Sequence, residues 1–235
     1  MVMTKPLDGP RIEPRGGRAS ALVVLLHGYG ANGDDLIALG DGWRRFLPDA
    51  AFVAPNAPEM IPGVHGGLQW FPLTQRDPSE YWHGVASAQP ALDRFLDADL
   101  ARYRLGADRL VLVGFSQGTM MALHVGLRRA ASPAGIVACS GLLAGPERLA
   151  ETKARPPVLL MHGEVDDMIP VEALHMAREA LAVAGIPVEW HVRPGLGHGI
   201  DPEAQWMAGH FIAQVLRGAR IPSPASGRPS PRPSP

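Results

Sequence analysis

The chain has little cysteine, no long apolar run and no excess of charge of either sign. Its 235 residues include a single cysteine, Cys139, which excludes an internal disulfide framework and suits a reducing compartment. No apolar run approaches the roughly 20 residues that a membrane-spanning helix needs, and residues 1–17 lack the apolar core of a secretory signal. The net charge of −1 provides no basic face for nucleic acid or an anionic membrane. We therefore expect a soluble cytoplasmic protein with no membrane span and no nucleic-acid partner.

Apolar runs alternate with helical patterns along most of the chain. Several of these runs lack polar alternation, as strands do when helices cover both faces of a parallel sheet. The alternation of strand and helix also implies right-handed crossovers. The pattern predicts an α/β fold with a mostly parallel central sheet and helices on both faces. The expected strands are 21–26, 51–54, 110–113, 135–139, 158–161 and 188–192, and the expected helices are 34–46, 85–103, 117–129, 171–184 and 202–216.

Three stretches lie outside this alternation. Residues 1–20 form an N-terminal arm before a single domain expected at residues 21–220. Residues 58–83 hold four aromatic residues without clear periodicity, which is typical of a lid or substrate-binding segment and equally of a hydrophobic cluster beneath a long loop. Residues 221–235 contain six prolines and four serines, which predicts a disordered extension.

The most informative motif is Gly114-Phe115-Ser116-Gln117-Gly118, between an expected strand and an expected helix. In that context G-x-S-x-G is typical of the nucleophile elbow of α/β-hydrolases. The glycines let the helix pack closely on the strand, and the serine takes a strained conformation that exposes its hydroxyl. We therefore expect an α/β-hydrolase fold with Ser116 as the leading site candidate.

A serine nucleophile needs a base and an acid that orients the base. His198 is the best candidate base because it follows the last strand in a glycine-rich loop, beyond the carboxyl edge of the sheet. Asp166 and Asp167 follow the preceding strand, and their spacing does not decide between them. Pro170 suits the first position of the next helix, which makes Ile169 the cap and leaves both aspartates free of that task. The order serine, aspartate, histidine is that of α/β-hydrolases.

Acyl transfer also needs hydrogen-bond donors for the oxyanion that develops in the transition state. The backbone N–H of Gln117, directly after the serine, is one candidate. The N–H of Tyr29 is the second, in the glycine-rich loop that follows the first expected strand of the domain. This G-x-G loop could suggest phosphate binding, but it has no P-loop lysine, and we expect neither phosphate binding nor a dinucleotide site here. Neither His-x-x-x-His nor Cys-x-x-Cys spacing occurs, and we expect no metal and no cofactor.

Taken together, five segments resemble the phospholipase/carboxylesterase family, which includes acyl-protein thioesterases and small bacterial carboxylesterases. The resemblance implies that Ser116 is the nucleophile, His198 the general base and Asp166 the aspartate of the triad. It implies that the amides of Tyr29 and Gln117 bind the oxyanion. It also implies an acyl-binding groove on the aromatic segment, formed by Leu68, Trp70 and Trp82. The segments are LLHGYGANGDDL (25–36), GFSQGTMMAL (114–123), ACSGLL (138–143), MHGEVDDMIP (161–170) and GLGHGI (195–200).

The function we expect is that of a serine hydrolase that cleaves carboxylic esters through an acyl-enzyme. An acyl-protein thioesterase or lysophospholipase acting on longer acyl chains is the alternative with the same triad. A non-catalytic ligand-binding protein with a hydrolase fold is the alternative of another class. The expected partner is a small-molecule ester or thioester, and a homodimer stays open as an assembly state.

Overall fold

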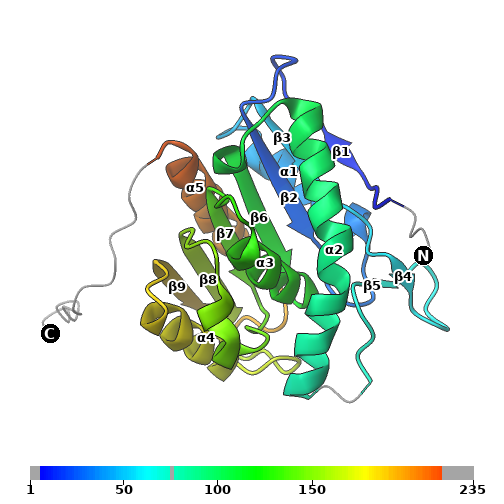
Figure 1. The fold of residues 1–235 in the computed structure, drawn as a ribbon, viewed down its shortest axis with the longest axis vertical. Helices are drawn as coiled ribbons and strands as arrows, with labels where there is room; N and C mark the ends of the chain where they lie inside the picture. The colour runs from blue at the N-terminus through cyan, green and yellow to red at the C-terminus, as the bar shows by residue number, and fades with distance from the viewer. Residues whose placement is uncertain (1–5, 75–76, 219–235) are drawn as a thin grey trace, which may run out of the picture.

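The computed structural model describes residues 6–74 and 77–218, built around a seven-stranded sheet (Figure 1). The strand order is β1-β3-β2-β6-β7-β8-β9; β1 runs antiparallel to β3, and all other neighbours are parallel. The predicted, mostly parallel sheet is therefore confirmed. The proline-rich segment 221–235 lies outside the described residues. The strands of the sheet are β1 (Arg11–Ile12), β2 (Ala21–Leu26), β3 (Ala50–Val53), β6 (Leu110–Phe115), β7 (Gly135–Cys139), β8 (Val158–Gly163) and β9 (Val188–Arg193).

All six expected strands are present, and β2 and β7 have the expected bounds. The strands β6, β8 and β9 continue one or two residues further than predicted, up to the turns that follow them. β1 was not expected, because two residues are too few to give a periodic pattern. It pairs Arg11 with Val53 and Ile12 with Phe52, so part of the N-terminal arm forms the edge of the sheet.

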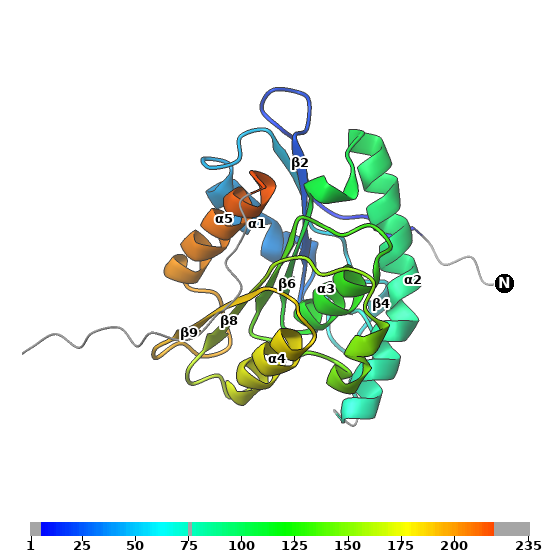
Figure 2. The ribbon, with the colours of Figure 1, turned by 60° about the vertical axis from the view of Figure 1, so that its left-hand side comes forward.

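Helices cover both faces of the sheet, as predicted (Figure 2). On one face α1 and α5 pack on a layer that includes Trp43, Phe52 and Phe211; on the other, α2, α3 and α4 pack on a second layer that includes Leu92, Met121 and Leu181. Among the helices of the described residues, none is long and apolar enough to cross a membrane. The helices are α1 (Gly33–Trp43), α2 (Pro78–Tyr103), α3 (Gln117–Arg128), α4 (Glu172–Val183) and α5 (Pro202–Leu216), with short 3₁₀ turns η1 (Ala107–Arg109) and η2 (Pro146–Glu151).

The described parts of segment 58–83, residues 58–74 and 77–83, contain more regular structure than their sequence suggests. They contain an antiparallel hairpin of β4 (Glu59–Met60) and β5 (Leu68–Gln69), and α2 begins at Pro78 instead of the predicted residue 85. The early start follows from the Asp77 side chain, which accepts a hydrogen bond from the Glu80 N–H (2.8 Å), with proline in the first turn. Trp70 and Phe71 are buried in the apolar layer beneath α2, α3 and α4.

The order of the strands determines where a site can form. From β2 the chain first adds β3 on one side, then returns to add β6 on the other side of β2. The loops at the carboxyl ends of β2 and β6 therefore lead to helices on opposite faces of the sheet, and such a switch point is where ligands bind in open α/β sheets. Tyr29 and Ser116 lie in these two loops, while Asp166 and His198 follow β8 and β9.

Candidate active site

Ser116 has a backbone conformation that is rare for any residue except glycine. Ser116 lies between the end of β6 and the first turn of α3, with a φ of 55° and a ψ of −117°. The Ser116 N–H donates to the Cys139 carbonyl (3.0 Å), which ties the turn to the neighbouring strand β7. A residue held in this way costs on the order of 1–3 kcal/mol of strain, which the surrounding structure must offset.

The two glycines of the elbow are required by close packing. A Cβ added at Gly118 would lie 1.9 Å from the Leu26 carbonyl oxygen, and one added at Gly114 would lie 2.4 Å from the Gly118 oxygen. Both contacts are with main-chain atoms, which cannot move away without breaking the turn. The predicted reason for these glycines, close approach of helix and strand, is confirmed.

Asp166 and His198 are joined by a hydrogen bond. The Nδ1 of His198 lies 2.8 Å from Oδ2 of Asp166, whose side chain is fully buried. The imidazole also packs on Phe115, with ring centroids 4.9 Å apart, which brings His198 beside the residue that precedes Ser116. The structure thus brings an aspartate and a histidine together next to the elbow.

The structure separates the two aspartates that the sequence left open. The Oδ1 of Asp166 accepts hydrogen bonds from the backbone N–H groups of Met168 (3.0 Å) and Ile169 (2.9 Å), whereas Asp167 is exposed. Burial alone would raise the pKa of Asp166. The hydrogen bonds from Ile169, His198 and Met168 outweigh burial and hold its pKa below the ordinary value.

The predicted helix start at Pro170 is wrong by two residues. α4 begins at Glu172 with Val171 as its N-terminal cap, and no side chain caps it. The reason is that Pro170 and Val171 first form tighter turns, in which their carbonyls accept from the N–H groups of Ala173 and Leu174.

His162 is a site residue that the sequence analysis did not single out. It is buried at the end of β8, and its Nε2 lies 2.8 Å from the Ile169 carbonyl oxygen and 3.3 Å from Oδ2 of Asp166. The Nε2–H therefore donates toward both oxygens and helps to hold the Asp166 turn. Its position four residues before an aspartate was visible in the sequence, but its contact with that aspartate depends on the fold of the turn.

The loop after β2 lies directly against Ser116. A Cβ added at Gly28 would be 3.2 Å from the Cβ of Ser116, so glycine is needed there for the two segments to meet. Tyr29 follows with its side chain 37% exposed. The loop is held by β5, since the Gly30 N–H donates to the Leu68 carbonyl (2.9 Å) and the Leu68 N–H donates to the Ala31 carbonyl (3.0 Å).

Gly28, Gly30 and Gly33 have the full G-x-G-x-x-G spacing between a strand and a helix, which the expectation of no dinucleotide site did not take into account. Here the glycines meet other needs. Gly28 makes room for Ser116, Gly30 has a φ of 82°, and a Cβ at Gly33 would lie 2.1 Å from the Ala54 carbonyl oxygen.

Two of the three residues expected to bind the acyl chain, Leu68 and Trp70, border one surface hollow, which Trp82 does not line. Trp70 is 1% exposed, and its indole N–H donates to the His27 carbonyl. Leu68 is partly buried in β5. Trp82, near the start of α2, lies within 5 Å of the guanidinium groups of Arg128 and Arg148 and meets the His124 ring edge-on.

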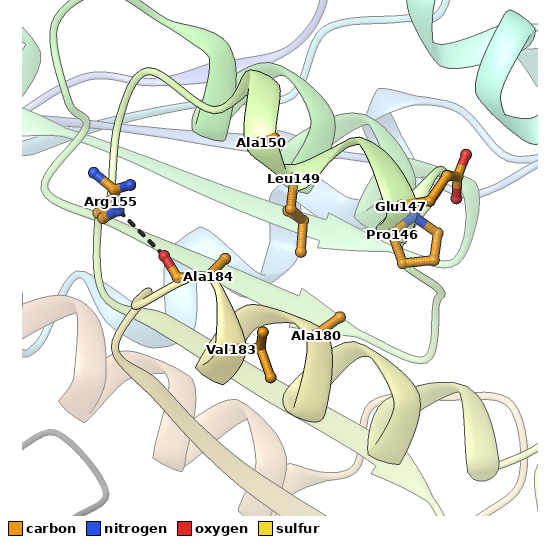
Figure 3. Close-up of a pocket in the computed structure, with 8 residues that line it drawn as sticks. All are labelled: Pro146, Glu147, Leu149, Ala150, Arg155, Ala180, Val183 and Ala184. Atoms are coloured by element: carbon orange, nitrogen blue, oxygen red, sulfur yellow. Dashed lines mark hydrogen bonds between the residues drawn. The ribbon is translucent and has the colours of Figure 1, made fainter.

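Two surface hollows show that volume alone does not locate the site. One of about 520 Å³ lies between η2 and α4 and is bordered by Leu149, Arg155 and Val183 (Figure 3). Another of about 890 Å³ is bordered by Leu68, Trp70, α2 and residues 6–10. Neither is lined by the residues predicted for catalysis. Within residues 6–74 and 77–218, no group of three or more His, Cys, Asp or Glu is placed to hold a metal ion.

The parallel sheet with helices on both faces and the strained serine between β6 and α3 define an α/β-hydrolase. Within that class the chain belongs to the phospholipase/carboxylesterase family, whose model matches residues 7–216. It is thus a hydrolase of the carboxylesterase and thioesterase type.

Individual proteins support the same placement. The chain is 43% identical to a protein of known structure, esterase PE8, over 90% of this chain and 100% of that one, with a TM-score of 0.86. It is 28% identical to acyl-protein thioesterase 1 of Gibberella zeae, over 83% of this chain and 90% of that protein. A carboxylesterase of Bacillus cereus shares the fold, with a TM-score of 0.72 at 18% identity over 89% of this chain and 94% of that one.

Proposed function

We propose that the protein is a serine esterase that hydrolyses carboxylic esters through a Ser116–His198–Asp166 triad. The Ser116 hydroxyl oxygen attacks the acyl carbonyl while the Nε2 of His198 takes the hydroxyl proton. The backbone N–H groups of Tyr29 and Gln117 bind the oxyanion. His198 returns the proton to the leaving alcohol as the ester bond breaks. Water, deprotonated by the same histidine, then attacks the acyl-enzyme and releases the acid and Ser116.

The observation that carries this proposal is the hydrogen bond of 2.8 Å between His198 Nδ1 and the buried carboxylate of Asp166, beside the strained Ser116. The bond fixes the tautomer in which Nδ1 is protonated and Nε2 is free to accept a proton. Two backbone N–H groups hold the other carboxylate oxygen, so the acid cannot rotate away.

The test compares Ser116→Ala with Ser132→Ala, which alters an exposed serine outside the helices and strands. We expect Ser116→Ala to lower kcat on p-nitrophenyl acetate by at least 10³-fold and to abolish labelling by a fluorophosphonate. Ser132→Ala should keep both. Near-normal turnover by Ser116→Ala would refute the mechanism. A wild-type protein that hydrolyses no ester or thioester and takes no fluorophosphonate would favour the non-catalytic alternative.

An acyl-protein thioesterase is the second candidate function. The observation that favours it is the likeness to proteins named acyl-protein thioesterase 1, which extends over most of the chain. The triad chemistry is the same, with a thiol as the leaving group. A series of acyl chain lengths on ester and thioester substrates separates the two. A short-chain ester optimum supports the esterase, and an optimum on long-chain thioesters supports the thioesterase.

A further inference from the structure

The two N–H groups proposed to bind the oxyanion lie beyond the last residues that the sheet pairs, one in the loop after β2 and the other at the first residue of α3. The last paired residues of β2 and β6 are Leu26 and Gly114. Tyr29 and Gln117 both lie three residues beyond this pair. Their relative position must therefore be held by contacts outside the β-ladder.

Trp70 makes one of these contacts. Its indole N–H donates to the His27 carbonyl oxygen (2.9 Å), two residues before Tyr29. The indole is 1% exposed and packs on the His27 ring, with centroids 5.5 Å apart. The His27 ring is itself held, because its Nδ1 bonds the Gly28 carbonyl and its Nε2 accepts from the Ala57 N–H.

The side chain of Gln117, the first residue of α3, completes the connection. The Oε1 of Gln117 accepts a hydrogen bond from the backbone N–H of Trp70 (2.9 Å), and its Nε2 donates to the Phe71 carbonyl (2.7 Å). Gln117 has no exposed surface. A continuous path thus runs from the Gln117 backbone through its amide to Trp70, and through the indole N–H to the loop that carries Tyr29.

We propose that Trp70 is a positioning residue that sets the distance between the two oxyanion donors. The proposal rests on the proposed function, because it assigns Trp70 to the oxyanion site of that reaction. An error of about 1 Å in such a site lowers the rate by about 100-fold, so the indole N–H affects kcat although it touches no substrate. This role differs from the acyl-binding role expected for Trp70, which would affect KM.

The matched pair for the test is Trp70→Phe and Trp43→Phe. Trp43 is also 1% exposed, and its indole N–H also donates to a carbonyl, that of Gln205 (2.7 Å), but it lies in the apolar layer on the opposite face of the sheet. Per folded molecule, we expect Trp70→Phe to lower kcat by about 10- to 100-fold, with KM for p-nitrophenyl acetate within about twofold of wild type. Affinity for a trifluoromethyl ketone, which places an oxyanion in the site, should fall in parallel. Trp43→Phe should keep kcat within about twofold.

Equal kcat in the two variants would overturn the proposal, and so would a chain-length-dependent rise in KM with unchanged kcat in Trp70→Phe. If Trp70→Phe does not fold, Gln117→Met breaks the same path while keeping the Gln117 N–H, and it should lower kcat to a similar extent. Where all variants fold, the double variant with Trp70→Phe and Gln117→Met should show a smaller fold-reduction in kcat than the product of the two single reductions, since both residues act in one path. Failure of the proposed function has a different signature, full activity in Ser116→Ala.

Discussion

Replacing Asp166 by asparagine tests the triad with a minimal change in shape. The amide oxygen can take the place of Oδ1 and keep the bonds from the Met168 and Ile169 N–H groups. The NH₂ group then replaces Oδ2, which lies 2.8 Å from His198 Nδ1 and 3.3 Å from His162 Nε2. The new NH₂ group, itself a donor, would then face the N–H groups of His198 Nδ1 and His162 Nε2, with no acceptor between them. We expect His198 to change to the tautomer with Nε2 protonated, which cannot accept the proton of Ser116.

The size of the effect follows from the loss of a correctly protonated base. The same substitution in a serine-protease triad lowers kcat by about 10⁴-fold with the geometry retained. At about 1.4 kcal/mol per factor of ten, this is about 5 kcal/mol of transition-state stabilisation. The buried carboxylate with four donors around it is a comparable case, so we expect Asp166→Asn to lower kcat by 10³- to 10⁴-fold.

The assay is steady-state hydrolysis of p-nitrophenyl esters at pH 7–8, with circular dichroism to show that the variant is folded. Asp167→Asn is the control, because that side chain is exposed and one residue away. It should keep activity within about twofold. A loss below tenfold in Asp166→Asn, or an equal loss in Asp167→Asn, would refute the assignment of Asp166.

Three further predictions concern stability and reactivity. Burial, and to a lesser extent the charge of Arg128, lowers the pKa of His124 from 6.5 to about 3, so the unfolded chain binds a proton here before the folded one does. The stability that neutral His124 contributes is therefore nearly complete at pH 7 and falls as the pH drops through 6.5, by about 2 kcal/mol at pH 5. Urea titrations at pH 7 and 5 should show a smaller loss in His124→Gln than in the wild type and an unchanged loss in the control His175→Gln, and equal losses in the two variants would contradict the prediction. Gly118→Ala places a methyl group 1.9 Å from a main-chain oxygen, so we expect the free energy of unfolding in urea to fall by about 3 kcal/mol, and a fall under 1 kcal/mol would show that the elbow can relax. Burial raises the pKa of Cys139 to about 12, so a disulfide reagent should modify it only on unfolding; fast reaction with the native protein would contradict its burial.

The sequence predicts best those parts of the site that follow strands directly. The apolar runs locate β6, β8 and β9 within two residues, and the carboxyl ends of parallel strands lie at one edge of the sheet. Ser116, Asp166 and His198 therefore could be predicted to lie near one another from their place after these strands. Spacing cannot decide between Asp166 and Asp167, and only the family resemblance points to Asp166, because the difference depends on which side chain turns inward to meet the Met168 and Ile169 N–H groups.

Contacts between distant segments are what the sequence does not reveal. The aromatic residues of segment 58–83 are compatible with a substrate surface and equally with a hydrophobic cluster beneath a long loop, and only the family resemblance assigns Trp70 and Trp82 to a groove. Only the path of the chain shows that the Trp70 indole meets the His27 carbonyl, 43 residues earlier, and that Trp82 packs beside Arg128. The same holds for β1, whose two residues become a strand only because β3 offers a free edge.

These placements bear on how acyl selectivity can arise. The indole N–H of Trp70 donates to the backbone carbonyl of His27, and the Trp82 ring lies within 5 Å of two guanidinium groups, so both side chains already have partners within the protein. Exposed apolar side chains beside the proposed machinery instead belong to Tyr29, Val165 and Met168, which are 37%, 59% and 57% exposed. Side chains on such loops can change without disturbing the strands or the hydrogen bonds that hold Asp166. We therefore expect substitutions at these exposed positions to change acyl preference without changing the geometry of the proposed triad, in line with the general observation that one fold can host different substrate preferences.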